Sequence, residues 1–433
     1  MATSHTVESR TTLSNDLKYR YEGALRDITP ERSVTLSLLK KGLGKTGWGG
    51  KSITVGLGLN FFGSASSAAE SGYMPDSTPI NVVNAVIPMK WHYFSVACTG
   101  QAMATTRDNA DAFAEAWATQ VMYKLKSHAQ HMNRQSLGDG NGYLAQVDGA
   151  PALSGSSNIV MTLNADNAFG ISGMNNSDVN GHTFISTNEI LQFYSSSTKR
   201  CTYPVKVTSW SRGDFPSTSA EIVCSCTAND CDSVADGDYI YTQYGYGNEA
   251  AGLRLLIDDN TIASTVQSLS ATTYSEWRSQ MGYGSTHGTA EALTRMRMMN
   301  MQTAIEAAGG NTKFILTSPA VWLTYGDTCA AENVPTNMKV MDNGFTTCEF
   351  NGVAMYKDPV MWDEMFWVDT DTIKIYEVMP EGWMDLDGSV IKMSPDRKDE
   401  WEAYWQWYMN FGTTDRSKNG KLVDITVRAN QTV

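Results

Sequence analysis

The chain has few of the features that assign a protein to a common class. Its 433 residues contain no apolar run near the ~18 residues that a membrane-spanning helix needs, so we expect no membrane segment. The first residues, MATSHTVESRTTLS, have no apolar core, so no secretory signal is expected. The seven cysteines are an odd number without regular spacing, which favours a reducing compartment over a disulfide framework.

Positive charge is also scarce. The chain carries 33 Lys and Arg against 46 Asp and Glu, which gives a net charge of −13. Affinity for nucleic acid or anionic lipid comes mainly from Lys and Arg, so this composition argues against a protein that coats either of them. Residues 1–50 are the exception, with a net charge of +3, whereas residues 221–260 hold eight acids against the single base Arg254.

The remaining composition is that of a globular chain. Hydrophobic residues make up 42% and charged residues 18%, a balance that a disordered chain does not have. The 36 glycines and the recurring β-type residues favour a mixed α+β fold over a helical one. The length is enough for two or three domains with a sizeable core.

Residues 1–50 are expected to form an N-terminal arm. A short amphipathic helix is predicted over 15–28, followed by an apolar cluster at 34–39 and the loop GLGKTGWGGKS, which we interpret as a flexible hinge. The arm has too few apolar residues to fold alone, so we expect it to lie along another surface.

Residues 51–104 are expected to form a long hairpin with a flexible tip. Apolar and small or polar residues alternate over 53–61, which indicates a half-buried strand, and a second extended run covers 80–99. The only charges between Ser52 and Met89 are Glu70 and Asp76. A two-stranded ribbon is marginal in water, so its strands need a surface from this chain or from a neighbouring copy.

A long helix is predicted over 106–134. Its apolar residues recur at helical spacing, and the glycines at 138, 140 and 142 are expected to end it. The apolar side consists of Phe113, Trp117, Val121, Leu125, Ala129 and Met132.

The rest of the chain predicts a β module, a helical region and a β-rich C-terminus. A second helix is expected over 289–308 and a buried strand over 313–317. Residues 399–411 and 423–429 both alternate, which predicts a hairpin whose aromatic face packs on the long helix. Strands of the β module are expected at 143–147, 159–163, 182–186, 205–210 and 222–226.

Two motifs suggest ligands but fail on spacing. A P-loop needs a further upstream glycine, yet Leu39 stands at that position before Gly44-Lys45, and Lys45 stands there before Gly50-Lys51. A structural zinc site needs a fourth ligand beside the C-x-C-x4-C pattern of Cys224, Cys226 and Cys231. The nearest further cysteine is Cys201, and ordinary reduced cysteines are the better interpretation.

Other candidate sites have simpler explanations. His128 and His131 share a face of the long helix, but no acid or third ligand stands near them in sequence. Asp385 and Asp387 lack the later ligands of a calcium loop and fit a β-turn. The twelve tryptophans, which could line a sugar groove, are placed as sheet and core residues instead. We therefore predict no catalytic, cofactor-binding or metal-binding residue, no cofactor and no enzymatic activity.

Four stretches carry a resemblance to a known family. They are DAFAEAWATQVMYKLKSHAQHMNRQSLGDGNGYLAQV (111–147), AAGGNTKFILTSP (307–319), FNGVAMYKDP (350–359) and NGKLVDITV (419–427). In this order they resemble the major capsid proteins of tailed bacteriophages, which have the Hong Kong 97-like fold. The resemblance covers most of the chain from about residue 85 onward.

The resemblance implies a domain organisation. The arm is 1–50 and the extended loop, or E-loop, is 51–104. A peripheral P-domain at 105–245 contains the long spine helix and the β module. An axial A-domain covers 246–349, and 350–433 supply the rest of the A-domain and the C-terminal P-domain strands.

The resemblance also implies a function. The chain would assemble with its own copies into pentamers and hexamers of an icosahedral head in the virion, formed in the host cytoplasm around double-stranded DNA. An acidic subunit would contact that DNA only weakly, through its arm. A portal and a separate scaffolding protein are implied partners, the latter because the arm is short for a built-in scaffold; a decoration protein is left open. No membrane partner is expected.

One departure and two alternatives remain. Some relatives crosslink an E-loop lysine to an asparagine, but no lysine lies between Lys51 and Lys90, so we expect a noncovalent shell. The first alternative is an encapsulin-like cellular compartment of the same fold, which would load cargo protein instead of DNA. The second is an acidic carbohydrate-binding or hydrolytic protein that uses exposed tryptophans.

Overall fold

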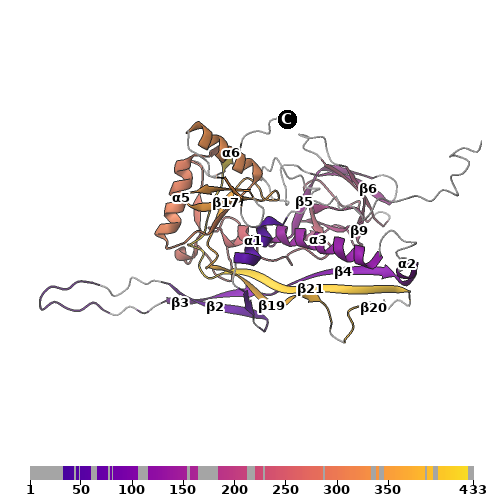
Figure 1. Ribbon diagram of the computed structural model, residues 1–433, viewed down its shortest axis with the longest axis horizontal. Helices are drawn as coiled ribbons and strands as arrows, with labels where there is room; N and C mark the ends of the chain where they lie inside the picture. The colour runs from indigo at the N-terminus through magenta and orange to yellow at the C-terminus, as the bar shows by residue number, and fades with distance from the viewer. Residues whose placement is uncertain are drawn as a thin grey trace, which may run out of the picture. The chain divides into compact units, whose positions relative to one another are not determined.

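The computed structural model in Figure 1 describes most of the chain from residue 33 onward. The helix expected at 15–28 and the start of the long helix, 106–115, lie outside the described residues. Those are 33–42, 45–47, 49–59, 66–76, 79, 81–105, 116–153, 157–163, 184–211, 220–227, 230–285, 288–332, 338–340, 346–385, 388–393 and 398–427.

The chain divides into two compact units, and each is described by itself. Unit 1 comprises Met1–Glu31, Phe94–Lys126 and Trp383–Tyr404. Unit 2 comprises Arg32–Tyr93, Ser127–Gly382 and Trp405–Val433. Boundaries fall inside four long elements, strand β4 (Lys90–Thr99), helix α3 (Ala116–Leu137), strand β19 (Ile373–Trp383) and strand β21 (Glu400–Thr413).

The predicted β module is a sheet that closes on itself in unit 2. Its order is β11-β5-β6-β10-β9-β7-β8, and β11 also pairs with β7. Phe193, Ile222 and Ile240 are fully buried, so side chains fill the inside as in other small barrels. The strands are β5 (Tyr143–Leu153), β6 (Asn158–Leu163), β7 (Ile190–Ser195), β8 (Thr198–Lys199), β9 (Val205–Ser211), β10 (Ala220–Ser225) and β11 (Tyr239–Thr242).

One strand of this module was predicted in the wrong place. The described part of 182–186 is not a strand, because the chain turns there: Asn188 has φ 70° and the Ser186 N–H donates to the Glu189 carboxylate at 2.8 Å. The strand that follows the turn is β7, which the sequence pattern did not reveal.

A second seven-stranded sheet in unit 2 packs with two helices, α5 (Arg295–Ala307) and α6 (Pro319–Ala331), which Figure 1 shows together. Met301 of α5 and Val321 of α6 share one buried cluster with the sheet residues. The order is β12 (Gln280–Gly282), β22 (Gly420–Leu422), β18 (Met365–Val368), β14 (Phe314–Thr317), β17 (Val353–Lys357), β16 (Thr346–Phe350) and β15 (Met338–Val340).

Helix α5 begins later than predicted. The Thr294 hydroxyl caps it by accepting from the Arg297 N–H at 3.3 Å, as threonine commonly does. The preceding residues form the short strand β13 (Glu291–Ala292), which pairs with β23 (Ile425–Thr426).

The remaining sheet has the order β1-β19-β21-β20, with β4 also paired to β21; its further strands are β1 (Lys45–Gly47), β19 (Ile373–Trp383) and β20 (Lys392–Met393). The predicted C-terminal hairpin is therefore wrong, because β22 and β23 belong to other sheets. The expected packing of β21 on the long helix is confirmed: Trp407 and Phe411 share a core with Met132 and Leu137.

Candidate assembly surfaces

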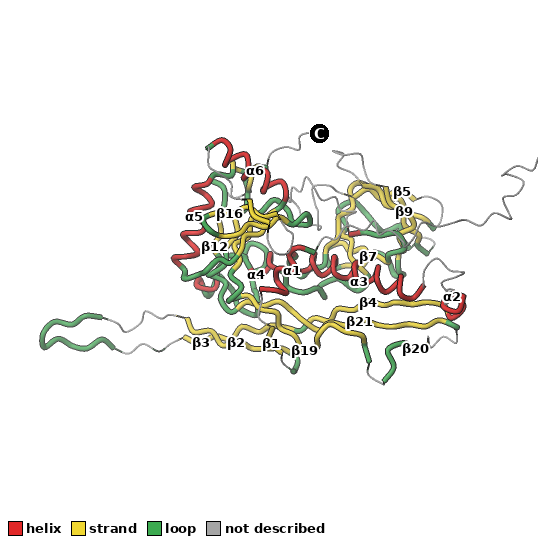
Figure 2. Tube along the Cα trace, in the orientation of Figure 1, coloured by secondary structure: helices red, strands yellow, loops and turns green. Residues whose placement is uncertain are grey.

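Part of the hairpin predicted at 51–104 is present as a two-stranded ribbon of β2 (Ser52–Leu59) and β3 (Asn81–Pro88). The later part of the predicted second strand does not belong to it, because that part forms β4, which pairs with β21 in another sheet. Figure 2 shows β2 and β3 side by side, and they pair with no further strand in the part of the chain that is described. The ribbon packs in part against the rest of unit 2, where Ala85 is buried with Leu269 and Trp277. Farther along, Val82 is 65% exposed, so this chain supplies only part of the surface that the ribbon needs.

The loop between the two strands presents large apolar side chains to solvent. Tyr73 is 100% exposed and Met74 is 89% exposed. They follow a tight turn in which the Gly72 N–H donates to the Ala69 carbonyl at 2.8 Å and Ser71 has φ 67°. The described tip is thus a defined turn that carries two apolar side chains without cover from its own chain.

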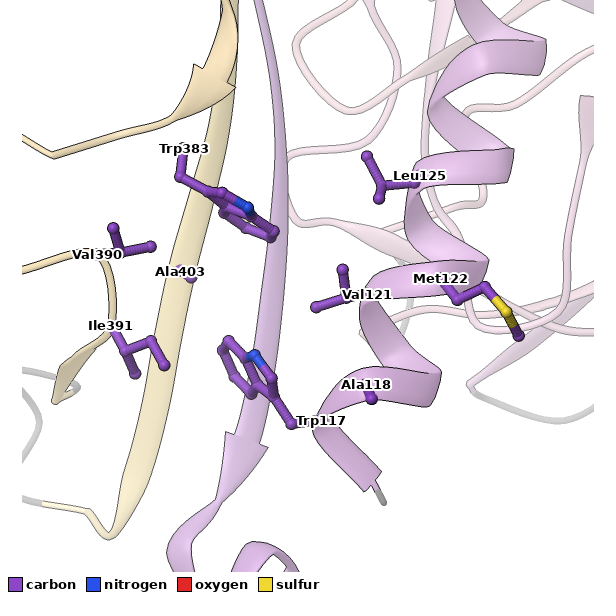
Figure 3. Close-up of a pocket in the computed structure, with 9 residues that line it drawn as sticks. All are labelled: Trp117, Ala118, Val121, Met122, Leu125, Trp383, Val390, Ile391 and Ala403. Atoms are coloured by element: carbon purple, nitrogen blue, oxygen red, sulfur yellow. The ribbon is translucent and has the colours of Figure 1, made fainter. Parts of the chain in front are cut away.

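Unit 1 contains an apolar groove of about 500 Å³. Figure 3 shows Trp117 and Val121 of α3 on one side and Trp383 and Ile391 on the other. Within 116–127 the charged residues of α3 are Lys124 and Lys126. The other residues that line the groove are Ala118, Met122, Leu125, Val390 and Ala403.

Helix α1 (Val34–Gly42) is anchored in the body of unit 2. The buried carboxylate of Asp358 accepts hydrogen bonds from the backbone N–H and the hydroxyl of Thr35, at 3.0 and 2.6 Å. Asn133 of α3 donates to the same carboxylate at 3.0 Å and accepts from the Leu36 N–H at 2.8 Å. The sequence motifs around Asn133 and Asp358 therefore meet here and fix the segment that follows residue 33.

This anchoring corrects two expectations about 1–50. Leu39 is fully buried in the core, and β1 pairs in parallel with β19, with Lys45 opposite Ile375. Residues 34–42 and 45–47 therefore belong to the body, where an arm had been expected. Lys45 and Thr46 of the predicted loop lie in a sheet strand, which argues against a free hinge at these residues.

The end of α3 is fixed by a buried ion pair. Arg134 pairs with Glu249 and also donates to the Tyr143 carbonyl at 3.1 Å. Burial raises the pKa of Glu249, and the Arg134 guanidinium opposes this rise. Gly140 and Gly142, with φ 82° and 92°, make the turn that follows. Arg134 and the glycines of the 111–147 stretch therefore have a structural role.

The two helix histidines lie near different groups and do not converge on one acid. Burial and the nearby Lys40 together lower the pKa of His128 to about 4. Burial and the neighbouring His128 lower the pKa of His92 to about 3. His131 instead lies 3.9 Å from Glu189, measured between Nε2 and Oε1.

The cysteines of the C-x-C-x4-C pattern lie close to Cys201, with 3.7 Å between the Sγ atoms of Cys201 and Cys231. Across the described residues, no group of three His, Cys, Asp or Glu side chains is placed to hold a metal ion. Asp387 lies outside the described part of the chain. Trp362, Trp367 and Trp407 are in the core, as predicted. Of the helices that the structure describes, none is long and apolar enough to cross a membrane.

No protein-family model and no curated protein matches the chain. The capsid asymmetric unit of cyanophage A-1(L) is similar to it, with a TM-score of 0.53 and 13% identity over 96% of this chain and 99% of that chain. The holo-SrpI encapsulin complex of Synechococcus elongatus PCC 7942 has a TM-score of 0.48 and 8% identity over 99% of each chain. The structure of Mycobacterium phage Bobi has a TM-score of 0.45 and 9% identity over 96% of this chain and 98% of that chain.

The cyanophage likeness establishes the fold. It extends over nearly the whole of both chains, so this chain has the mixed α+β, Hong Kong 97-like fold of a phage capsid subunit. The fold expected from the sequence resemblance is confirmed.

Proposed function

We propose that this chain is the major capsid protein of a tailed phage. It assembles with its own copies into pentamers and hexamers of an icosahedral head that encloses double-stranded DNA. The proposal keeps the expected E-loop, P-domain and A-domain and shortens the arm to the residues before α1. Scaffolding and portal proteins are its partners, and a host cytoplasm is the place of assembly.

The observation that carries the proposal is a complementary pair of surfaces. The ribbon tip exposes Tyr73 and Met74 in a segment whose only charges are Glu70 and Asp76. The unit 1 groove is apolar, and its helix carries lysines in the same stretch. We commit to the tip of a second copy as the occupant, because its exposed apolar side chains match the apolar lining of the groove, and Lys124 lies next to the lining residue Leu125 in α3, where it could meet the acids of the tip.

The net charge of −13 supports a shell that encloses DNA and does not coat it. An encapsulin-like compartment would have the same fold, so the contents of the particle distinguish the two. A sugar-binding protein is less well supported, because Trp362, Trp367 and Trp407 are buried, and the exposed Trp91 and Trp210 lie in strands of different sheets.

Expression of the chain together with its neighbouring genes tests the proposal. We expect sedimentation and negative-stain microscopy to show closed particles, and nuclease-protected DNA inside them. Particles filled with a cargo protein would favour the compartment. A stable monomer under all these conditions would contradict both.

A matched pair of variants tests the tip. Replacing Tyr73 and Met74 by serine should reduce the yield of particles while leaving the subunit folded. The control replaces Tyr203 and Met296, which are also exposed, at 55% and 69%, but lie outside the ribbon. Equal yields from the two variants would overturn the role of the tip.

A further inference from the structure

Two buried thiols face each other between two loops of the barrel. Cys201 lies in the loop before β9, and Cys231 lies in the loop after β10. Their Sγ atoms are 3.7 Å apart, and each residue is 1% exposed. A disulfide needs about 2.0 Å between its sulfurs, so small movements of the two side chains would close the gap.

Other bonds hold these loops together. The Asp230 carboxylate accepts from the N–H groups of Thr202 and Tyr203 at 2.9 and 2.8 Å. Arg200 binds Asp238 through two hydrogen bonds of 2.9 and 3.1 Å. The approach of the two thiols is thus set by the loops, and it does not depend on the chance orientation of a side chain.

A third thiol gives access from solvent. Cys226 directly follows β10, is less buried than the other two, and its thiol interacts with that of Cys231. The three sulfurs therefore form a series from the surface to the buried pair: Cys226, Cys231 and Cys201.

We propose that Cys201 and Cys231 are a redox modification site that forms an intrachain disulfide when the protein meets a small-molecule disulfide such as oxidised glutathione. Cys226 attacks the oxidant, forms a mixed disulfide and releases one reduced glutathione. Cys231 then attacks Cys226 and expels the second reduced glutathione. Finally Cys201 attacks Cys231 and returns Cys226 to a thiol. Two protein thiols are oxidised and one external disulfide is reduced.

Burial of the thiols makes this reaction slow, and the disulfide that it forms stabilises the fold. Desolvation raises the pKa of Cys226 to about 12, so few thiolates are present near neutral pH and the rate should rise with pH. A reducing cytoplasm would keep the pair reduced. The bond would close a loop that contains β9 and β10, which restricts the unfolded chain and should raise Tm by roughly 5 °C.

The test treats the purified full-length chain with oxidised glutathione in mildly alkaline buffer and then traps free thiols with an alkylating reagent. We expect mass spectrometry to find a Cys201–Cys231 linked peptide, an alkylated Cys226 and a raised Tm. Cys201→Ser should abolish the linked peptide and the Tm increase. The control Cys329→Ser, which replaces a buried cysteine of helix α6, should behave as the unmodified sequence does.

Two results would overturn the proposal. In the first, Cys226 carries glutathione after the oxidation, yet Cys201 and Cys231 are both fully alkylated once the sample is denatured. The other is a linked peptide that joins Cys231 to Cys224. If Cys226→Ser forms the pair as fast as the unmodified chain, the role of Cys226 is wrong. None of these outcomes depends on particle assembly.

Discussion

Thr35 and Asp358 are joined by two hydrogen bonds to a single carboxylate oxygen, although they are far apart in sequence. Asn133 donates to the same oxygen, and the other carboxylate oxygen accepts from the Val360 N–H at 2.9 Å. One fully buried carboxylate therefore connects α1, α3 and the turn after β17. A buried charge is tolerated when several donors satisfy it, as here.

Replacing Asp358 by alanine should destabilise the chain by about 3 kcal/mol, because Thr35 and Asn133 would keep buried donors without their acceptor. Chemical denaturation measures this loss, and limited proteolysis should show faster cleavage near α1. The control is Asp371→Ala, which removes a carboxylate that is 71% exposed and pairs with Lys313 at 3.3 Å. The control should cost no more than about 0.5 kcal/mol, and equal losses would contradict the anchoring role.

Gly252 offers a second test of packing beside the same helix end. A Cβ at this position would overlap the backbone carbonyl oxygens of Gln135 and Gly138, and these cannot move without disturbing the end of α3. Gly252→Ala should therefore cost about 2 kcal/mol or more. Gly326 of α6 has open space around it, so Gly326→Ala should stabilise by roughly 0.5–1 kcal/mol. Denaturation midpoints that move in the same direction would contradict this comparison.

Periodicity predicted the elements well and their partners poorly. The spacing of Trp117, Val121 and Leu125 indicated one helix face, and that face lines the groove. Alternation likewise located β2 and β21. It could not show that β22 pairs in another sheet and not with β21, because alternation defines a strand and does not specify its neighbour.

Contacts between distant residues were also invisible in the sequence. Nothing in the pattern indicated that Thr35 meets Asp358 or that Cys201 meets Cys231. The exposed tip shows why: Tyr73 and Met74 would suit a core by composition, and only the structure shows that their own chain leaves them uncovered.

Low pH should destabilise the folded chain because two of its histidines are buried. The folded-state pKa values of His92 and His128, about 3 and about 4, are below the ordinary value of 6.5, so the unfolded chain takes up these protons first as pH falls. The free energy of unfolding should therefore fall below about pH 6.5, by at most about 1.4 kcal/mol per pH unit for each imidazole. The contribution of His128 should level off near pH 4 and that of His92 near pH 3. Urea denaturation at several pH values measures the slope. His128→Gln should make it shallower, and an unchanged slope would contradict this origin.

Assembled particles should contain no covalent bonds between subunits. The ribbon loop has no lysine between Lys51 and Lys90, so its tip cannot supply the amine of an isopeptide bond to a neighbour. Boiling purified particles in detergent with a reducing agent should release monomers of 47.5 kDa. A ladder of larger species that survives this treatment would contradict the prediction.

The tip and the groove should also respond to an exchange of charge. Glu70→Lys with Asp76→Lys places positive charge opposite the lysines of α3 and should lower the fraction of subunits in particles, most strongly at low salt. Adding Lys124→Glu should restore part of that fraction, because opposite charges then face each other again. Each exposed pair contributes no more than about 1 kcal/mol, but the contact recurs in every copy of a shell.

The control for this exchange is Asp232→Lys with Glu276→Lys, which makes the same change in net charge away from the ribbon. It should leave the particle fraction close to that of the unmodified chain. If the control and the tip variant lower the fraction equally, net charge is the cause. If the added Lys124→Glu lowers the fraction further, the tip of a second copy does not lie beside α3, and the groove needs a different occupant.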